Sequence, residues 1–184
     1  MIREDAWQIL CEYTTTDRMR KHALSVEAVM RLAAEKYGGD IETWGIVGLL
    51  HDFDYEIYPD LRHPLEGSKI LEARGVPEEI VHAIQCHAPF INPEYRCDMD
   101  KAILAFDELT GFVTAVALVR PNKSLGEVEP SSVRKKMKDK AFARTVLRED
   151  IILGAEKLGA DLDDNIRLVV EGLKPVAAEI GLNP

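Results

Sequence analysis

The sequence predicts an all-α fold, a helical bundle that forms a single domain over residues 1–184. Apolar residues recur at helical spacing through most of the chain, and no stretch has the sustained alternation, rich in β-branched residues, that is typical of a strand. A hydrophobic content of 46% in 184 residues is enough for one sizeable core. No repeat, low-complexity tract or linker divides the chain, so one helical domain is the simplest interpretation.

Clear sequence signals bound the first two predicted helices. Residues 3–13 form an amphipathic helix. Thr16 or Asp17 can cap a second helix, which Gly38-Gly39 ends. His22 falls on the apolar stripe of this second helix, so we expect its side chain to point inward.

Each of the next three predicted helices has a histidine at one end. Asp40 caps a helix that carries the dipeptide His51-Asp52 after an apolar run. His63-Pro64 opens a short helix, and Pro77 fits the first turn of the one that follows. His87 lies near the end of that helix, on its apolar face.

A long apolar segment from about Asp98 to Val119 predicts a central helix, with Asp107 among its apolar residues. Pro121 and Pro130 mark the loop after it. Residues 130–182 are expected to pack on the preceding core through three helices: a basic one from Ser131, one through Ile151–Leu158 and a last one from Asp161 to Ile180.

Composition limits the class of partner. The formal charge of −9 argues against long nucleic acid, because binding to a polyanion needs a basic surface. The three cysteines contain no Cys-x-x-Cys pair and leave an odd count, which argues against a disulfide scaffold or a zinc ribbon. No apolar run reaches the length of a membrane span, and the N-terminus lacks a secretory signal pattern. We therefore expect a cytoplasmic protein that does not bind membranes.

Six residues with metal-binding side chains occur where helices or helix ends could direct them inward. A lone histidine on an apolar face is more often a hydrogen-bonded core residue than a ligand. A carboxylate buried among apolar residues, however, is costly unless it is paired or coordinates a cation. Four histidines and two aspartates on five predicted helices are harder to explain one by one. The set is His22, His51, Asp52, His63, His87 and Asp107.

Imidazole and carboxylate donors suit a divalent transition metal, such as Mn, Fe, Ni, Co or Zn, better than calcium. Six ligands exceed the needs of one tetrahedral ion, so one or two ions are expected, with Asp52 as the natural bridge. An ion with an open position would activate water near neutral pH, which makes Asp52 a candidate catalytic residue as well as a ligand. His82 lies off the apolar face of its helix and is expected at the surface or in a supporting position.

The order of these residues resembles the ligand pattern of the HD superfamily of metal-dependent phosphohydrolases. Segments 63–68 and 86–87 resemble the additional histidines of its two-metal, HDIG-type branch. The likeness covers about residues 18–120, the helical core of that family. It implies one ion on His22, His51, Asp52 and Asp107, and a second on His63 and His87 beside the bridging Asp52.

Two departures from the family pattern lie close to the predicted ligands. The HDIG branch has Ile-Gly after the His-Asp pair, whereas this chain has Phe53-Asp54. Asp54 is therefore a candidate catalytic residue, for proton transfer or for support of a ligand. His87 stands alone where many relatives have two histidines in a row. The chain after Pro121 shares no motif with the superfamily and does not indicate the substrate.

Several basic residues are candidates for binding a phosphate group. Six lysines and arginines within residues 134–144 are typical of a solvated helix face, although they could also clamp a phosphate. Arg62, next to His63, and Arg120 and Lys123, after the central helix, are slightly favoured for that role.

The sequence thus predicts a metal-dependent hydrolase of a small phosphate ester, with nucleotides among the candidates, that uses metal-activated water. Two alternatives remain open. A di-iron oxygenase of the same superfamily would use the same ligands, and a non-catalytic helical sensor would bind metal without turnover. The chain lacks the glycine-rich phosphate loops and the Gly-x-Ser-x-Gly motif of other nucleotide-binding proteins and hydrolases.

Overall fold

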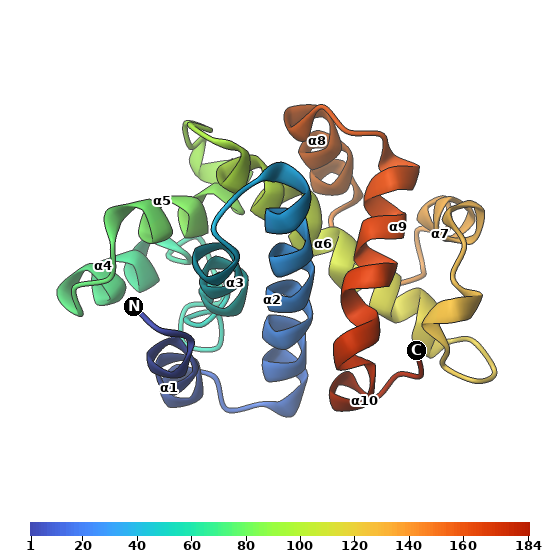
Figure 1. The fold of residues 1–184 in the computed structure, drawn as a ribbon, viewed down its shortest axis with the longest axis horizontal. Coiled ribbons are helices and arrows are strands. Elements are labelled where there is room, and N and C mark those ends of the chain that lie inside the picture. Colours follow the sequence, from blue (N-terminus) through green and yellow to red (C-terminus); the bar gives the residue numbers. More distant parts are fainter.

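The structure, a computed structural model, describes residues 1–184 and confirms the predicted all-α class (Figure 1). Extended backbone pairs only at one isolated bridge, between Ser124 and Asn183. Short 3₁₀ turns occur at Pro89–Ile91, Leu125–Glu127 and Lys174–Val176. The α-helices are α1 (Arg3–Tyr13), α2 (Asp17–Tyr37), α3 (Ile41–Leu50), α4 (Leu65–Ala73), α5 (Glu78–Cys86), α6 (Asp98–Leu118), α7 (Pro130–Met137), α8 (Arg148–Leu158), α9 (Leu162–Leu173) and α10 (Ala177–Ile180).

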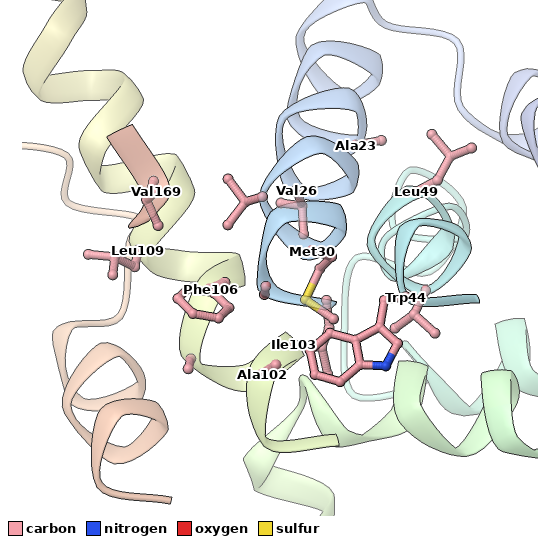
Figure 2. Packing of buried hydrophobic residues seen from close by; sticks show 14 of the residues in the cluster. Ala23, Val26, Met30, Trp44, Leu49, Ala102, Ile103, Phe106, Leu109 and Val169 are labelled. Atoms are coloured by element: carbon pink, nitrogen blue, oxygen red, sulfur yellow. The ribbon is translucent and has the colours of Figure 1, made fainter. Parts of the chain in front are cut away.

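The two longest helices, α2 and α6, form the centre of the bundle. In Figure 1, α3 lies on one side of α2 and α9 on the other, while α6 crosses behind, and contacts join α2 to all three. Figure 2 shows Val26 and Met30 of α2 between the side chains of α3 and those of α6. Phe53, Phe106 and Phe112 are the largest fully buried side chains. The core therefore surrounds the two helices that carry His22 and Asp107.

Capping residues set the boundaries of α2 and α3 where the sequence predicts them. Thr16 is the N-cap of α2, and its hydroxyl oxygen accepts the N–H of Met19 at 3.4 Å. Asp40 is the N-cap of α3, and its carboxylate accepts the N–H of Thr43 at 2.8 Å. Gly38 ends α2 with a φ of 74°, which favours glycine.

Glycines allow two helix pairs to pack at very short range. A Cβ atom at Gly48 of α3 would lie 2.7 Å from the carbonyl oxygen of Val26 in α2. A Cβ atom at Gly154 of α8 would collide with the backbone of α6 at Ala105. Gly48 lies three residues before His51, so the close contact between α2 and α3 brings the end of α3 towards His22.

Two helices differ from the sequence prediction. Helix α3 ends at Leu50, so His51 caps it and Asp52 begins the turn that follows. The predicted helix from Asp161 to Ile180 is divided into α9, a 3₁₀ turn and α10. Pro175 lies at the division, because proline has no N–H to donate and clashes with the preceding helical turn.

None of the helices combines the length and the apolar character needed to cross a membrane.

Candidate metal centre

Six side chains that the sequence singles out lie together in one cluster. Contacts join α2 to α3 and α6, and α5 to α3, α4 and α6. The positions are the first half of α2 (His22), the end of α3 and the residue after it (His51 and Asp52), the turn before α4 (His63), the end of α5 (His87) and the middle of α6 (Asp107).

The first group of donors consists of His22, His51 and Asp107. Asp107 Oδ1 lies 3.0 Å from His22 Nε2 and 3.2 Å from His51 Nε2. The two ring nitrogens are 3.2 Å apart. Two nitrogens and one oxygen therefore converge from α2, α3 and α6 on one point.

The second group of donors consists of Asp52, His63 and His87. Asp52 Oδ1 lies 3.1 Å from His63 Nε2 and 3.6 Å from His87 Nε2. The two ring nitrogens are 2.9 Å apart. This arrangement repeats the first group, with two imidazoles and one carboxylate oxygen.

Asp52 connects the two groups through its two carboxylate oxygens. While Oδ1 faces His63 and His87, Oδ2 lies 3.5 Å from His51 Nε2 and 3.8 Å from His22 Nε2. A carboxylate with one oxygen on each of two donor groups is in the position of a bridging ligand. The side chains of Asp52 and His22 are about one-fifth exposed, whereas His51 is fully buried, so the cluster opens to solvent on the side of Asp52 and His22.

Hydrogen bonds behind the rings fix the nitrogen that faces the cluster. His51 Nδ1 donates to the Gly48 carbonyl at 2.7 Å, and His87 Nδ1 donates to the Ile84 carbonyl at 2.5 Å. A carbonyl oxygen only accepts, so Nδ1 carries the proton and Nε2 of the neutral ring has a free lone pair. Metal-binding histidines are oriented in this way in other proteins.

The directions of the ring lone pairs show that these residues fit a cation. In the neutral state the lone pairs of the His51 and His87 rings point into the cluster, each within about hydrogen-bond distance of another imidazole nitrogen. Such lone pairs repel one another unless a cation or a proton lies between them. Imidazole and carboxylate donors are the set that divalent transition metals prefer, so the residues fit one or two such ions.

Electrostatics in the metal-free chain also favour positive charge at both groups. Burial disfavours the protonated form of His51, but the carboxylates of Asp52 and Asp107 outweigh it and raise its pKa to about 9. The pKa of His63 is also raised to about 9, because Asp52 and Asp54 outweigh burial. Burial and the charge of His63 lower the pKa of His87 to about 4. Although burial opposes their ionisation, the pKa values of Asp52 and Asp107 are lowered, chiefly by His51.

Asp54 lies behind His63 and is fully buried. Its Oδ1 accepts a hydrogen bond from His63 Nδ1 at 2.6 Å, and its Oδ2 accepts the N–H of Gly67 at 2.9 Å. A Cβ atom at residue 67 would lie 2.5 Å from Asp54 Cγ, so glycine is needed there. Asp54 thus supports His63 from the side away from the donor group.

Glu56 fastens the turn after α3 to the start of α2. Its carboxylate accepts the backbone N–H groups and the hydroxyls of both Thr15 and Thr16, with distances from 2.5 to 3.0 Å. These hydrogen bonds lower the pKa of Glu56. They hold the turn that carries Asp52 against the helix that carries His22.

The candidate phosphate-binding residues lie at different distances from the cluster. Arg62 directly precedes His63, is exposed, pairs with Asp60 and covers the ring of Tyr58. Arg120 and Lys123 follow the end of α6, at least 13 residues after Asp107, which corresponds to roughly 20 Å along a helix. The basic run 134–144 covers the end of α7 and the turns after it, and its Arg134 pairs with Asp163 of α9.

Two features near the cluster were not recognised from the sequence. Glu108, next to Asp107, has its pKa raised to about 8 by burial and by the charge of Asp107. His82, predicted at the surface or in a supporting position, lies beside Cys86 and Asp100 and forms a third group of donors. The spacing of His82 and Cys86, four residues apart on one helix, is a signal that could have identified this group.

Comparison with protein families gives one result. The family model of the HD domain matches residues 19–116, which is more than half of the chain and includes all six residues of the cluster. Searches of curated proteins and of solved structures gave no match. The matched segment carries the His-Asp dipeptide and begins and ends on α2 and α6, the helices of His22 and Asp107. The chain therefore belongs to the HD domain family, the superfamily of metal-dependent phosphohydrolases.

Proposed function

We propose that this protein hydrolyses a small phosphate ester, such as a nucleotide, with two divalent transition-metal ions at the six-residue cluster. The observation that carries the proposal is the position of Asp52, which directs one oxygen to each of two histidine pairs. Paired ions a few ångströms apart are common in enzymes that act on phosphate esters. Membership of the HD domain family supports the same class of reaction.

Each of the six residues has a role in this proposal. His22, His51 and Asp107 hold one ion, His63 and His87 hold the other, and Asp52 binds both. Bound ions would activate a water molecule and neutralise charge on the phosphoryl oxygens. The exposed side of Asp52 and His22 is where a substrate phosphate would approach.

For Asp54 we propose a positioning role in place of proton transfer. Its two oxygens are occupied by His63 and by the N–H of Gly67, and its side chain is closed to solvent. A carboxylate behind a metal-binding histidine holds the ring in place and increases its basicity. Asp54 therefore acts on the reaction through His63.

Arg62 is the basic residue that we propose for contact with the substrate. It is adjacent to His63, and its exposed guanidinium group can exchange Asp60 for a phosphate, which it can bind with two parallel hydrogen bonds. Arg120 and Lys123 lie beyond the end of α6, so this proposal assigns them no contact with a substrate at the cluster.

The test combines metal analysis with a screen of phosphorylated metabolites in the presence of Mn²⁺, Co²⁺, Ni²⁺ or Mg²⁺. We expect metal-dependent release of phosphate that Asp52→Asn abolishes. The matched control is Asp164→Asn, which removes an exposed carboxylate on α9 and should leave activity unchanged. Metal bound at the cluster without release of phosphate from any ester would contradict the proposal. Oxygen uptake by an iron-loaded protein would favour the oxygenase reaction instead.

A further inference from the structure

A second cluster of metal-binding side chains lies where α5 meets the start of α6. His82 and Cys86 come from successive turns of α5, and Asp100 comes from the first turn of α6. Their donor atoms all lie within 4.8 Å of one another. The backbone carbonyl of Glu94, in the segment between the two helices, also faces His82 and Cys86.

The distances from His82 Nε2 to Cys86 and to Asp100 match two edges of a tetrahedron around a zinc ion. With Zn–N and Zn–O bonds of about 2.05 Å and a Zn–S bond of about 2.3 Å, the edges are about 3.6 Å for N–S and about 3.3 Å for N–O. His82 Nε2 lies 3.6 Å from Cys86 Sγ and 3.4 Å from Asp100 Oδ2. The Glu94 carbonyl oxygen lies 3.8 Å from Cys86 Sγ and 2.9 Å from His82 Nε2. Only the distance from the Glu94 oxygen to His82 Nε2 is clearly shorter than the corresponding edge of the tetrahedron.

Several polar groups meet at His82 Nε2, which lies beside the Glu94 carbonyl, the Asp100 carboxylate and the Cys86 sulfur. The Cys86 thiol donates to the Glu94 carbonyl, and Asp100 Oδ2 accepts two backbone N–H groups. The ring nitrogen of His82 carries at most one proton, which it can donate to one of its three neighbours. A cation can be shared by all four groups at once.

The cluster also has the support and the access that a metal site needs. Asp100 Oδ2 accepts the backbone N–H groups of Arg96 at 2.8 Å and Cys97 at 3.2 Å, which fixes the carboxylate. Cys86 and Asp100 are buried, whereas the side chain of His82 is 12% exposed and borders solvent. An ion can therefore enter along His82 and reach donors that are already oriented.

This cluster is separate from the one around Asp52. Asp100 precedes Asp107 by seven residues on α6, which is about 10 Å along the helix. Cys86 is next to His87, but His87 directs Nε2 to His63 and Asp52. The two clusters thus use different donor atoms, although α5 and α6 contribute to both.

We propose that His82, Cys86, Asp100 and the Glu94 carbonyl form a closed, four-coordinate site for Zn²⁺. The thiolate and the carboxylate balance the charge of the ion, and one proton leaves the thiol of Cys86 on binding. Four protein donors leave no open position, which is typical of structural zinc sites. The ion would join α5 to α6 and so fix the helices that carry His87 and Asp107.

Co²⁺ distinguishes this site from the Asp52 cluster, because only this site contains a thiolate. We would strip the full-length protein of metal, add Co²⁺ stepwise and record the near-ultraviolet charge-transfer absorption of a cobalt–thiolate bond. The band should appear in the wild-type protein and disappear in Cys86→Ser. It should persist in Cys11→Ser, the matched cysteine control, and in Asp52→Asn, in which the other cluster is impaired.

Several outcomes would overturn the proposal. The wild-type titration is sufficient by itself, since absence of a thiolate band at every Co²⁺ loading shows that the site does not bind metal. Persistence of the band in Cys86→Ser would assign it to another cysteine. If Cys86→Ser does not fold, His82→Gln tests the same site, and an unchanged band in that variant would equally refute it.

Discussion

The two halves of the Asp52 cluster have similar donors but different supports. His22 and Asp107 project from within the two longest helices, and His51 is held by a carbonyl of its own helix. His63 lies in a turn and depends on a buried carboxylate, Asp54, which in turn depends on Gly67. The difference indicates that the half around Asp107 is rigid by its secondary structure, whereas the half around His63 depends on a chain of local contacts. The second ion should therefore be the easier one to lose.

Asp107→Asn should have the largest effect of the substitutions that separate the two halves. It removes the charge that His22 and His51 share, so we expect loss of the first ion and a fall of phosphatase activity to background. Metal analysis should show about half of the wild-type content, because His63 and His87 keep Asp52 as a ligand. Full metal content in this variant would show that Asp107 is not a ligand.

Asp54→Asn should weaken only the half around His63. Loss of a carboxylate behind a metal-binding histidine typically lowers metal affinity about 10- to 100-fold. We expect a biphasic metal titration in which one ion binds as in the wild type and the other more weakly. Asp60→Asn is the control, since it alters an exposed carboxylate in the same turn. An unchanged metal titration would show that Asp54 does not support metal binding through His63.

Two glycine substitutions compare the halves directly and should have a smaller effect. A Cβ atom at Gly67 would press on Asp54, so Gly67→Ala should reproduce part of the Asp54→Asn effect on metal binding. A Cβ atom at Gly111 of α6 would lie 3.9 Å from His22 Cε1, which is an ordinary contact, so Gly111→Ala should bind both ions normally. Isothermal titration of metal into both variants checks this contrast. Metal binding that is weakened in Gly111→Ala as much as in Gly67→Ala would contradict it.

The pH dependence of stability should differ between the metal-free and the metal-bound protein. His51 and His63 have pKa values raised from 6.5 to about 9, so their stabilising protonation is complete below pH 6.5 and is lost as the pH rises to 9. His87, with a pKa lowered to about 4, acts oppositely and destabilises the fold as the pH falls below 6.5. We therefore expect the Tm of the metal-free protein to fall from pH 6.5 to pH 9. Calorimetry should show no such fall with metal bound, since the ions replace these protons.

Much of the fold could be predicted from local sequence signals. Thr16, Asp40 and Gly38 bound α2 and α3 as expected, because capping depends on neighbouring residues only. The division of the last predicted helix was missed, although Pro175 signals it. Helix α3 ends at Leu50, two residues before the predicted end at Asp52, and differences of one or two residues at helix ends are common.

The candidate site was only partly predictable. His22 and Asp107 could be placed on inward-facing stripes by periodicity, and the family pattern grouped them with the other histidines. The supporting contact of Asp54 with His63, and the approach of Asp100 to His82 and Cys86, depend on turns whose paths the sequence does not specify. The distance of Arg120 and Lys123 from Asp107 follows from the length of α6 and could have been estimated beforehand.

Anomalous diffraction from crystals grown with Mn²⁺ tests the central claim most directly. The account predicts two ions, one between His22, His51 and Asp107 and the other between His63 and His87, with one oxygen of Asp52 on each. A single ion that leaves His63 and His87 without contact, or ions that bind away from Asp52, would contradict it.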